Sequence, residues 1–432
     1  MKLVRTYGVG AKETDRLLRQ IENRSATATS RLEPAVKRII ASLRRDGDLA
    51  LRRYAERLDG LAPGTALRVE RSEMAEAWEQ TPAELHKAMQ TAATNIRRFA
   101  QWQMPRAWKR TSQGIELGQQ CLPLESVACY VPGGRYPLPS TLFMTTIPAQ
   151  VAGVERIVVV SPRPAKETLA AAYLAGVTEF YRIGGAQAIA ALAYGTVSIP
   201  RVDKIVGPGN LYVTTAKRLV AFDCGIDMMA GPTEIVVASE TGDPQWIAAD
   251  LVAQSEHDPE TMAVLVTSNA ELARATALAV EIQAADNKIA LQSLKRNGFI
   301  FLTKNKNETA AVTNRLAAEH VTIDNKKDLD WLRHAGSIFI GTQTPQSMGD
   351  YISGPNHVLP TGRLAKIRAG LSVYDFLRLA TTQEYNAEGL AQLGPQAIRL
   401  AEAEGLAGHA ASVRIRIDEQ SPSRTRKRRA RR

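Results

Sequence analysis

Apolar positions recur at helical spacing through residues 1–110. Leu17, Leu18 and Ile21 fall on one helical face, and the apolar positions between 36 and 43 repeat the pattern. Pro82 precedes a long amphipathic stretch that reaches Met104, which predicts a helix with proline at its first turn. This part of the chain is therefore predicted to be mostly helical.

From about Gly114 the pattern changes to short apolar runs that alternate with helical stretches and Gly/Pro turns. Strands are predicted at 115–117, 126–131, 156–160, 179–183 and 204–206. Helices are predicted at 166–175 and 184–194, and a further helix opens at 207–210. The alternation predicts an α/β domain with a mostly parallel sheet over roughly 130–234.

A second alternating series follows and predicts a second α/β domain of similar construction. Its strands are predicted at 234–238, 262–267, 299–302, 320–323 and 337–340. Its helices are predicted at 244–256, 270–283, 306–317 and 329–334. Beyond about Leu371 we expect helices at 373–380 and 384–404 and a short closing strand at 413–417.

The net charge of +11 first suggests an acidic partner such as nucleic acid. The segment 421–432 carries seven Lys and Arg and no acid, however, and +11 less these seven charges leaves +4 for residues 1–420. The tail is expected to be a solvated, disordered extension, with non-specific affinity for nucleic acid as the alternative. We expect no specific nucleic-acid partner.

The number of cysteines and the lengths of the apolar runs indicate the expected cellular location of the protein. Three cysteines, Cys121, Cys129 and Cys224, exclude a disulfide framework and a metal site of four thiolates from one chain. They suit a reducing cytoplasm, which is the expected location. No apolar run is long enough to span a membrane, and residues 1–24 lack the apolar core of a signal peptide.

Four of the six histidines stand beside other ligand-type residues. Gln254 and His257 share one helical face just before Pro259, so they could hold a divalent metal or simply form a polar helix end. Glu319 and His320 precede a predicted strand, where a carboxylate and an imidazole form an acid/base pair or a surface loop dipeptide.

The other two of these four histidines, His357 and His409, lie near glycines. Asp350 and His357 lie in a Gly/Pro-rich loop, which is either functional or a well-capped turn. Glu404 and His409 flank a Gly-containing helix end, where a histidine is often only a favourable dipole partner. The ordinary dinucleotide fingerprint, the Walker A loop, H-E-x-x-H and C-x-x-C are all absent, so a nucleotide would need a variant α/β crevice.

Taken together, the motifs resemble those of the histidinol dehydrogenase family. Each motif is weak alone, but their joint order over roughly residues 25–417 is highly specific. The matching segments are YVPGG at 130–134, GGAQAIAAL at 184–192, VDKIVGPGN at 202–210, AGPTE at 230–234, QSEH at 254–257, EH at 319–320, and GD through NHVLP at 349–360.

The resemblance implies a role for individual residues of this chain. It implies one zinc ion per subunit with Gln254, His257, Asp350 and His409 as ligands, a set of nitrogen and oxygen donors that suits zinc. It makes Glu319 and His320 the catalytic acid/base pair. The implied substrate contacts are Thr233, Gln254, His257, His320, Asp350, His357, Glu404 and His409, and the implied NAD contacts are Tyr130, Gln187 and Asn210.

The implied reaction is the zinc-dependent, NAD-linked oxidation of L-histidinol to L-histidine through L-histidinal, the last two steps of histidine biosynthesis. His320 is then the general base for the alcohol and for the hydrated aldehyde, and Glu319 activates the water. No thiol intermediate on Cys129 is required. Oxidation of another polyol or amino alcohol, and zinc-dependent hydrolysis without NAD, are the alternatives.

The resemblance also implies an architecture of two Rossmann-like, aldehyde-dehydrogenase-like α/β domains with parallel-rich sheets and small helical ends. The expected ranges are a helical segment at 1–24, a discontinuous α/β domain with the zinc and catalytic residues at 25–129 and 235–371, a cofactor domain at 130–234, a helical docking domain at 372–420 and the basic tail at 421–432. The docking domain implies a homodimer in which Glu404 and His409 complete the partner's site.

Overall fold

The structure of the protein, a computed structural model, describes residues 1–133, 136–229 and 231–420. The expectations for Gly134, Ala230 and the tail lie outside these residues. The chain divides into two compact units, Met1–Met104 with Leu124–Phe376, and Pro105–Pro123 with Leu377–Arg432. Within the described residues no helix is both long and apolar enough to cross a membrane.

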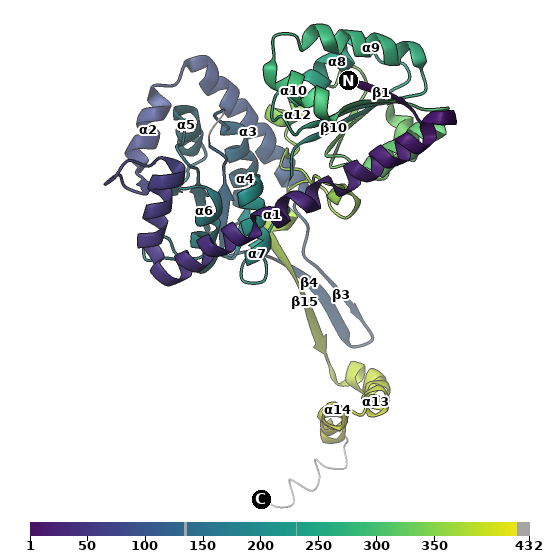
Figure 1. Ribbon diagram of the computed structural model, residues 1–432. Coiled ribbons are helices and arrows are strands. Elements are labelled where there is room, and N and C mark those ends of the chain that lie inside the picture. The colour runs from purple at the N-terminus through teal and green to yellow at the C-terminus, as the bar shows by residue number, and fades with distance from the viewer. Residues whose placement is uncertain (134–135, 230, 421–432) are drawn as a thin grey trace, which may run out of the picture. The chain divides into compact units, whose positions relative to one another are not determined.

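The first unit holds two six-stranded sheets with helices packed on them (Figure 1). In the first sheet the strand order is β2-β7-β6-β5-β8-β9, and only the pairing of β2 with β7 is antiparallel. Its strands are β2 (Arg68–Val69), β5 (Ser126–Tyr130), β6 (Arg156–Val160), β7 (Glu179–Tyr181), β8 (Lys204–Val206) and β9 (Gly225–Ile226). Its helices are α2 (Arg71–Glu79), α3 (Ala83–Gln103), α4 (Pro139–Ala152), α5 (Lys166–Leu174), α6 (Gly185–Tyr194) and α7 (Leu211–Val220).

The second sheet is parallel throughout, in the order β1-β12-β11-β10-β13-β14. Its strands are β1 (Lys2–Arg5), β10 (Glu234–Ala238), β11 (Met262–Thr267), β12 (Gly298–Leu302), β13 (His320–Ile323) and β14 (Ser337–Ile340). Its helices are α8 (Pro244–Ser255), α9 (Ala270–Gln283), α10 (Lys288–Asn297), α11 (Lys306–Leu316) and α12 (Gln346–Tyr351). The strands β10, β11 and β12 are buried along their whole length, as expected of parallel strands covered on both faces.

The N-terminal segment differs from the helix expected over residues 1–24. It begins with β1, which pairs with β12 at the edge of the second sheet. The helix α1 (Ala11–Tyr54) follows, with Gly47 in a left-handed conformation at φ 51°, and a π-helical turn (Ala55–Asp59) ends it. α1 packs against α11 and β1 and also against α6 and α7.

The two sheets also divide the chain differently from the expected domain ranges. Strands β2 and β5 come from the range 25–129, which was assigned to the same domain as 235–371, yet both belong to the first sheet. The physical reason lies in β5, which forms the centre of that sheet by pairing with β6 on one side and β8 on the other. The 130–234 series cannot form a continuous sheet without it.

The second unit corrects two expectations. The predicted helix at 373–380 is a short 3-10 turn (Val373–Phe376) followed by strand β15 (Leu377–Tyr385). This strand pairs antiparallel with β4 (Ile115–Pro123), which also pairs with β3 (Trp108–Ser112), so a three-stranded sheet replaces the helix. A stretch as short as 377–380, with Leu377 and Leu379 on either side of Arg378, fits the period of a helix or of a strand, and long-range pairing decides between them.

The predicted strand at 413–417 is part of a helix, α14 (Ala407–Gln420), which packs on α13 (Ala387–Ala403). Alternating β-branched residues suggested a strand, but Val413 and Ile417 are also one helical turn apart. A Cβ at Gly394 of α13 would lie 2.5 Å from Cδ1 of Ile417, so the glycine lets the two helices approach closely. Tertiary packing overrides strand propensity here.

The helix predicted at 329–334 in the first unit is only a 3-10 turn, Lys326–Asp330.

Candidate active site

Glu319 and His320 lie side by side at the amino end of β13, with exposed fractions of 7% and 2%. The register that pairs His320 with Ile235 brings Glu319 next to the start of β10. There the backbone N–H of Glu234 donates to Oε2 of Glu319 at 2.9 Å, and the carbonyl of Glu234 lies 3.2 Å from Nδ1 of His320. The predicted acid/base pair is therefore buried and held by one neighbouring residue, not placed in a surface loop.

A chain of hydrogen bonds joins Gln254, Thr233 and Glu319. The amide Nε2 of Gln254 donates to Oγ1 of Thr233 at 2.7 Å, and that hydroxyl donates to Oε2 of Glu319 at 2.5 Å. Because the hydroxyl proton goes to the carboxylate, Thr233 can only accept from Gln254. This order fixes the Gln254 amide with Nε2 toward Thr233, which leaves Oε1 as its remaining acceptor.

The two ring nitrogens of His320 have different surroundings. Nδ1 faces the Glu234 carbonyl, which can only accept a hydrogen bond, so Nδ1 carries a proton. The amide nitrogen of Gln254 lies 3.4 Å from Nδ1, but both atoms are then donors and do not form a hydrogen bond with each other. Nε2 is buried, has no hydrogen-bond partner among the described residues and lies 3.4 Å from Oδ1 of Asp350. Nε2 is thus the nitrogen that faces the expected reacting groups.

Burial and charge shift the pKa values of this cluster. Burial raises the pKa of Glu319 to about 7, although His320, Thr233 and the Glu234 N–H oppose the shift. Burial alone would lower the pKa of His320, but the carboxylates of Glu319 and Asp350 outweigh it and raise that pKa to about 9. Burial acts to raise the pKa of Asp350, but contact with His320 lowers it below its ordinary value. Closely coupled groups with perturbed pKa values are typical of acid/base sites.

Asp350 lies in the helix α12 and not in the loop expected from the sequence, and the irregular segment that leads from α12 to His357 is ordered by contacts with other elements. Nδ1 of His357 donates to the backbone carbonyl of Asp350 at 2.7 Å, so Nε2 accepts from the Thr141 hydroxyl of α4 at 3.1 Å. Burial lowers the pKa of His357, in agreement with a neutral ring. A cavity of about 150 Å³ lies here, lined by His320, Asp350, Asn356, His357 and Phe339 among others.

His257 lies just beyond the C-terminal end of α8, which stops at Ser255, so it does not continue the helical face of Gln254 as expected. Its Nδ1 donates to the backbone carbonyl of Gln254 at 3.2 Å, a bond that fixes the tautomer with the lone pair on Nε2. Metal-bound histidines usually donate their second ring nitrogen in this way.

The expected metal ligands of the first unit fit a divalent cation by chemistry. They are the amide oxygen of Gln254, the imidazole of His257 and the carboxylate of Asp350. Nitrogen and oxygen donors without thiolate suit zinc. Among the described residues no group of three or more His, Cys, Asp or Glu could hold a metal ion. Of the three expected ligands, only His257 and Asp350 belong to these residue types, since Gln254 would bind through an amide oxygen.

The expected cofactor residues lie at the carboxyl edge of the first sheet, where its strand order reverses between β5 and β8. Tyr130 ends β5, and its hydroxyl accepts from the N–H of Gly185 at 3.1 Å at the start of α6. In the first turn of α6, Gln187 is 1% exposed, and its Oε1 has no hydrogen-bond partner among the described residues. Asn210 follows β8 and caps α7 by accepting from two backbone N–H groups.

Asp59 is a residue of this edge that the sequence did not indicate. Its Oδ2 accepts from Nε2 of Gln187 and from the N–H of Gly184, each at 3.0 Å. Burial raises the pKa of Asp59. Only its place in the Leu-Asp-Gly turn at 58–60 hints at a special role.

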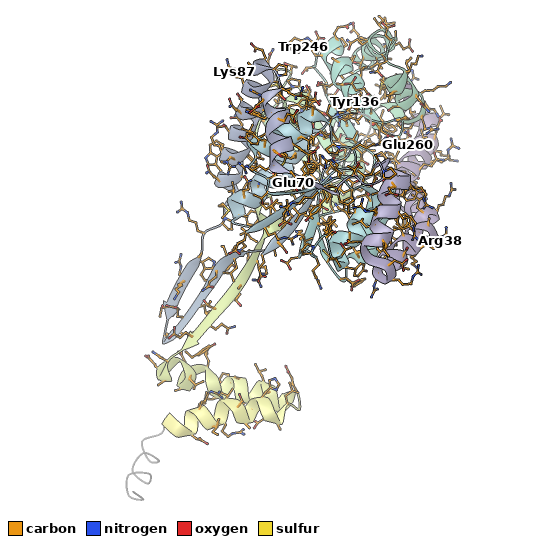
Figure 2. The ribbon with its side chains drawn as sticks, turned by 90° about the vertical axis from the view of Figure 1, so that its left-hand side faces the viewer. Arg38, Glu70, Lys87, Tyr136, Trp246 and Glu260 are labelled. Atoms are coloured by element: carbon orange, nitrogen blue, oxygen red, sulfur yellow. The ribbon has the colours of Figure 1, made fainter. Side chains whose placement is uncertain are left out.

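The carboxyl edge of the second sheet is filled by the protein itself. Asp324 accepts from the Ser239 hydroxyl at 2.5 Å and from the N–H of Glu240 at 2.7 Å. A cavity of only about 30 Å³ remains, lined in part by Trp246, whose half-exposed side chain is labelled in Figure 2. This sheet therefore carries the candidate site at its amino edge.

Two expected site residues belong to the second unit. Glu404 follows the last residue of α13, and His409 lies in the first turn of α14 with its N–H on the carbonyl of Leu406. Both are exposed.

Cys129 is fully buried in β5, and burial raises its pKa to about 12, which argues against a thiolate nucleophile.

Two mostly parallel sheets with a buried carboxylate–imidazole pair define an α/β enzyme with acid/base chemistry. The family model of histidinol dehydrogenase matches residues 22–417. The chain belongs to the histidinol dehydrogenase family, and it is an oxidoreductase.

Individual relatives agree with this assignment. The chain is 42% identical to histidinol dehydrogenase of Aquifex aeolicus (strain VF5) over 408 residues, which covers 92% of this chain and 96% of that protein. It is 43% identical to histidinol dehydrogenase of Gluconobacter oxydans (strain 621H), over 97% of this chain and all of that protein. The crystal structure of histidinol dehydrogenase from Elizabethkingia anophelis superposes with a TM-score of 0.86 at 34% identity and covers 90% of this chain and 92% of that one. The predicted family and fold class are confirmed.

Proposed function

We propose that the protein oxidises L-histidinol to L-histidine through L-histidinal, in two successive NAD-linked steps. The observation that carries this proposal is the buried Glu319–His320 pair, with Gln254 and Asp350 against the two nitrogens of the imidazole. Relatives named histidinol dehydrogenase at 42% and 43% identity support the choice of substrate.

Each oxidation removes a proton from an oxygen and a hydride from the adjacent carbon. His320 takes the proton from the alcohol in the first step and from the hydrated aldehyde in the second, through Nε2, while Nδ1 continues to donate to the Glu234 carbonyl. Only the neutral imidazole can act in this way, and its raised pKa means that it becomes neutral at alkaline pH. Glu319 takes a proton from the water that adds to the aldehyde. Its Oε2 is held by Thr233 and Glu234, so Oε1 is the oxygen assigned to the water.

Two groups complete the proposed site. A zinc ion held by Gln254, His257, Asp350 and His409 would bind the substrate through its imidazole and amino nitrogens and so fix the reacting carbon. NAD, bound near Tyr130, Gln187 and Asn210, would accept the hydride. The amide order set by Thr233 supports Gln254 as an oxygen ligand, because Nε2 is already used.

We further propose a homodimer in which Glu404 and His409 of one subunit serve the site of the other. The support is that both residues are exposed and lie in a separate unit of the chain. We also propose a reducing cytoplasm as the location, which is supported by three free cysteines.

The test follows NADH absorbance with purified protein, zinc, NAD and L-histidinol. We expect two NADH per L-histidinol, no NADH from leucinol, which lacks the imidazole, and loss of activity with a chelator that zinc restores. NADH only from another alcohol would replace the substrate assignment, and activity that is independent of the chelator would remove zinc from the proposal.

A further inference from the structure

Glu234 holds both members of the proposed acid/base pair with its backbone. Its N–H donates to Oε2 of Glu319 at 2.9 Å, and its carbonyl accepts from Nδ1 of His320 at 3.2 Å. Glu319 and His320 are neighbours in the chain, and one residue of the adjacent strand fixes the carboxylate of the first and the tautomer of the second. The relative placement of the two groups therefore depends on where the backbone of Glu234 lies.

The side chain of Glu234 anchors that backbone to two distant segments. It is 2% exposed, and its Oε1 accepts from Nη2 of Arg24 at 2.7 Å and from the N–H of Gly362 at 3.0 Å. Arg24 also donates to the carbonyl of Pro232 at 3.3 Å. The N–H of Gly231 donates to the Thr361 hydroxyl at 2.5 Å, so the loop before β10 is tied to the same turn twice.

Among the described residues, Arg24 is the only ion-pair partner of Glu234. The ion pair is largely shielded, with side-chain exposures of 18% for Arg24 and 3% for Glu234. Each partner also keeps one buried atom without a hydrogen bond among the described residues, Nε of Arg24 and Oε2 of Glu234. Removal of one partner leaves the other charge buried and uncompensated, which forces a local shift.

We propose that Glu234 is a positioning residue, and that the Arg24–Glu234 ion pair sets the geometry of the Glu319–His320 pair through the backbone of Glu234. This inference rests on the proposed function of those two residues. Glu234 is assigned no contact with substrate. A shift of its backbone moves both reacting groups, so the variants should lower kcat far more than they change KM.

The test compares Glu234→Gln, Arg24→Met and Arg24→Lys with the wild type, with each variant loaded with zinc. Glu234→Gln and Arg24→Met should lower kcat by about 10- to 100-fold, with the KM for L-histidinol and NAD within about twofold of wild type. Arg24→Lys keeps the charge and should recover most of kcat. Zinc content and the melting temperature are measured for every variant.

The Arg156–Glu179 ion pair of the first sheet provides the matched control. It is also partly shielded, with side-chain exposures of 26% and 21%, and it joins β6 to β7 away from the Glu319–His320 pair. Glu179→Gln and Arg156→Met should lower the melting temperature and leave kcat within about twofold.

The outcomes separate the two proposals. If the wild type oxidises L-histidinol and both Glu234→Gln and Arg24→Met keep its kcat, the inference is overturned. The same holds if the control pair lowers kcat equally, or if KM rises as much as kcat falls. A wild type that is inactive with L-histidinol overturns the proposed function instead. If Glu234→Gln does not fold, the comparison of Arg24→Met with Arg24→Lys decides.

Discussion

The hydroxyl of Thr233 lies 2.5 Å from Oε2 of Glu319 and donates its proton to that carboxylate. The sequence resemblance assigned Thr233 to substrate contact, whereas in the structure its hydroxyl links Gln254 to Glu319. A proposed metal ligand and a proposed base thus share one hydroxyl group, and the orientation of each depends on it.

Thr233→Val should break this link at little cost in volume. The buried Gln254 amide and the Glu319 carboxylate each lose a partner, so we expect a loss in kcat of about 10- to 100-fold and a loss in stability of about 1–3 kcal/mol. Steady-state kinetics and urea unfolding measure the two effects. Thr233→Ser keeps the hydroxyl and should remain near wild type; equal losses in both variants would refute the link.

Glu319→Gln should separate the two oxidations. The amide oxygen still accepts from Thr233 and from the Glu234 N–H, but the side chain no longer takes a proton from water. We expect the second oxidation to fall by about 100-fold and the first by less than about tenfold. A carbonyl trap such as semicarbazide should then capture an aldehyde. Equal loss of both steps would show that Glu319 has another role.

Asp59→Ala should weaken NAD binding. The substitution removes the acceptor that holds Gln187 and the N–H of Gly184, so the edge that carries the expected cofactor contacts loosens. We expect the KM for NAD to rise about tenfold while the KM for L-histidinol changes little. Asp59→Asn keeps an acceptor oxygen and serves as the control. An unchanged KM for NAD in Asp59→Ala would argue against this edge as the cofactor site.

Asp250 makes stability depend on pH. Burial raises the pKa of Asp250 from 3.8 to about 6, against one hydrogen bond from the backbone of Gln346. The folded state therefore binds this proton more tightly than the unfolded state, and the contribution of Asp250 is most favourable at low pH and is lost as pH rises through about 4 to 6.

Asp250→Asn removes this penalty because the amide is neutral and still accepts from the backbone. Since Asp250 is partly exposed, we expect a gain of at most about 2 kcal/mol in the free energy of unfolding near pH 8 and none near pH 4. Urea titrations at the two pH values measure it. A gain of equal size at both values would mean that the carboxyl group does not titrate as described.

Subunit mixing tests the shared site. We expect His409→Ala and Gln254→Ala to be inactive alone, and a mixture of the two to regain about a quarter of wild-type activity through hybrid dimers with one intact site. Differently tagged subunits show that hybrids form. Hybrids without any recovery would place His409 and Gln254 in the same subunit's site or remove His409 from it.

The sequence predicted the two parallel sheets well because their strands are continuous apolar runs such as 262–267 and 156–160. It failed at 377–385 and 413–417, where pairing with β4 and packing on Gly394 decide the structure. The local sequence pattern carries no information about either of these long-range contacts. The short β1 was missed for the same reason, since its pairing partner β12 is remote.

For the candidate site, the motifs predicted a set of residues but not their arrangement. Glu319 and His320 were recognised as a pair, and the resemblance carried Gln254 and Asp350 to the same place. The role of Glu234 was invisible because it uses backbone groups, which every residue has. Asp59 and Thr141 were missed since their partners, Gln187 and His357, are far along the chain.

The edge position of β1 has a consequence for the order of synthesis. Thr6, which follows β1, meets its partner Leu302 only after another 296 residues. At about 5–20 residues per second, β1 waits about 15–60 s until β12 has been synthesised. The sheet that carries Glu319 and His320 is thus closed at one edge by a strand that is made long before its partner, so a chaperone that holds β1 during synthesis would delay completion of this sheet.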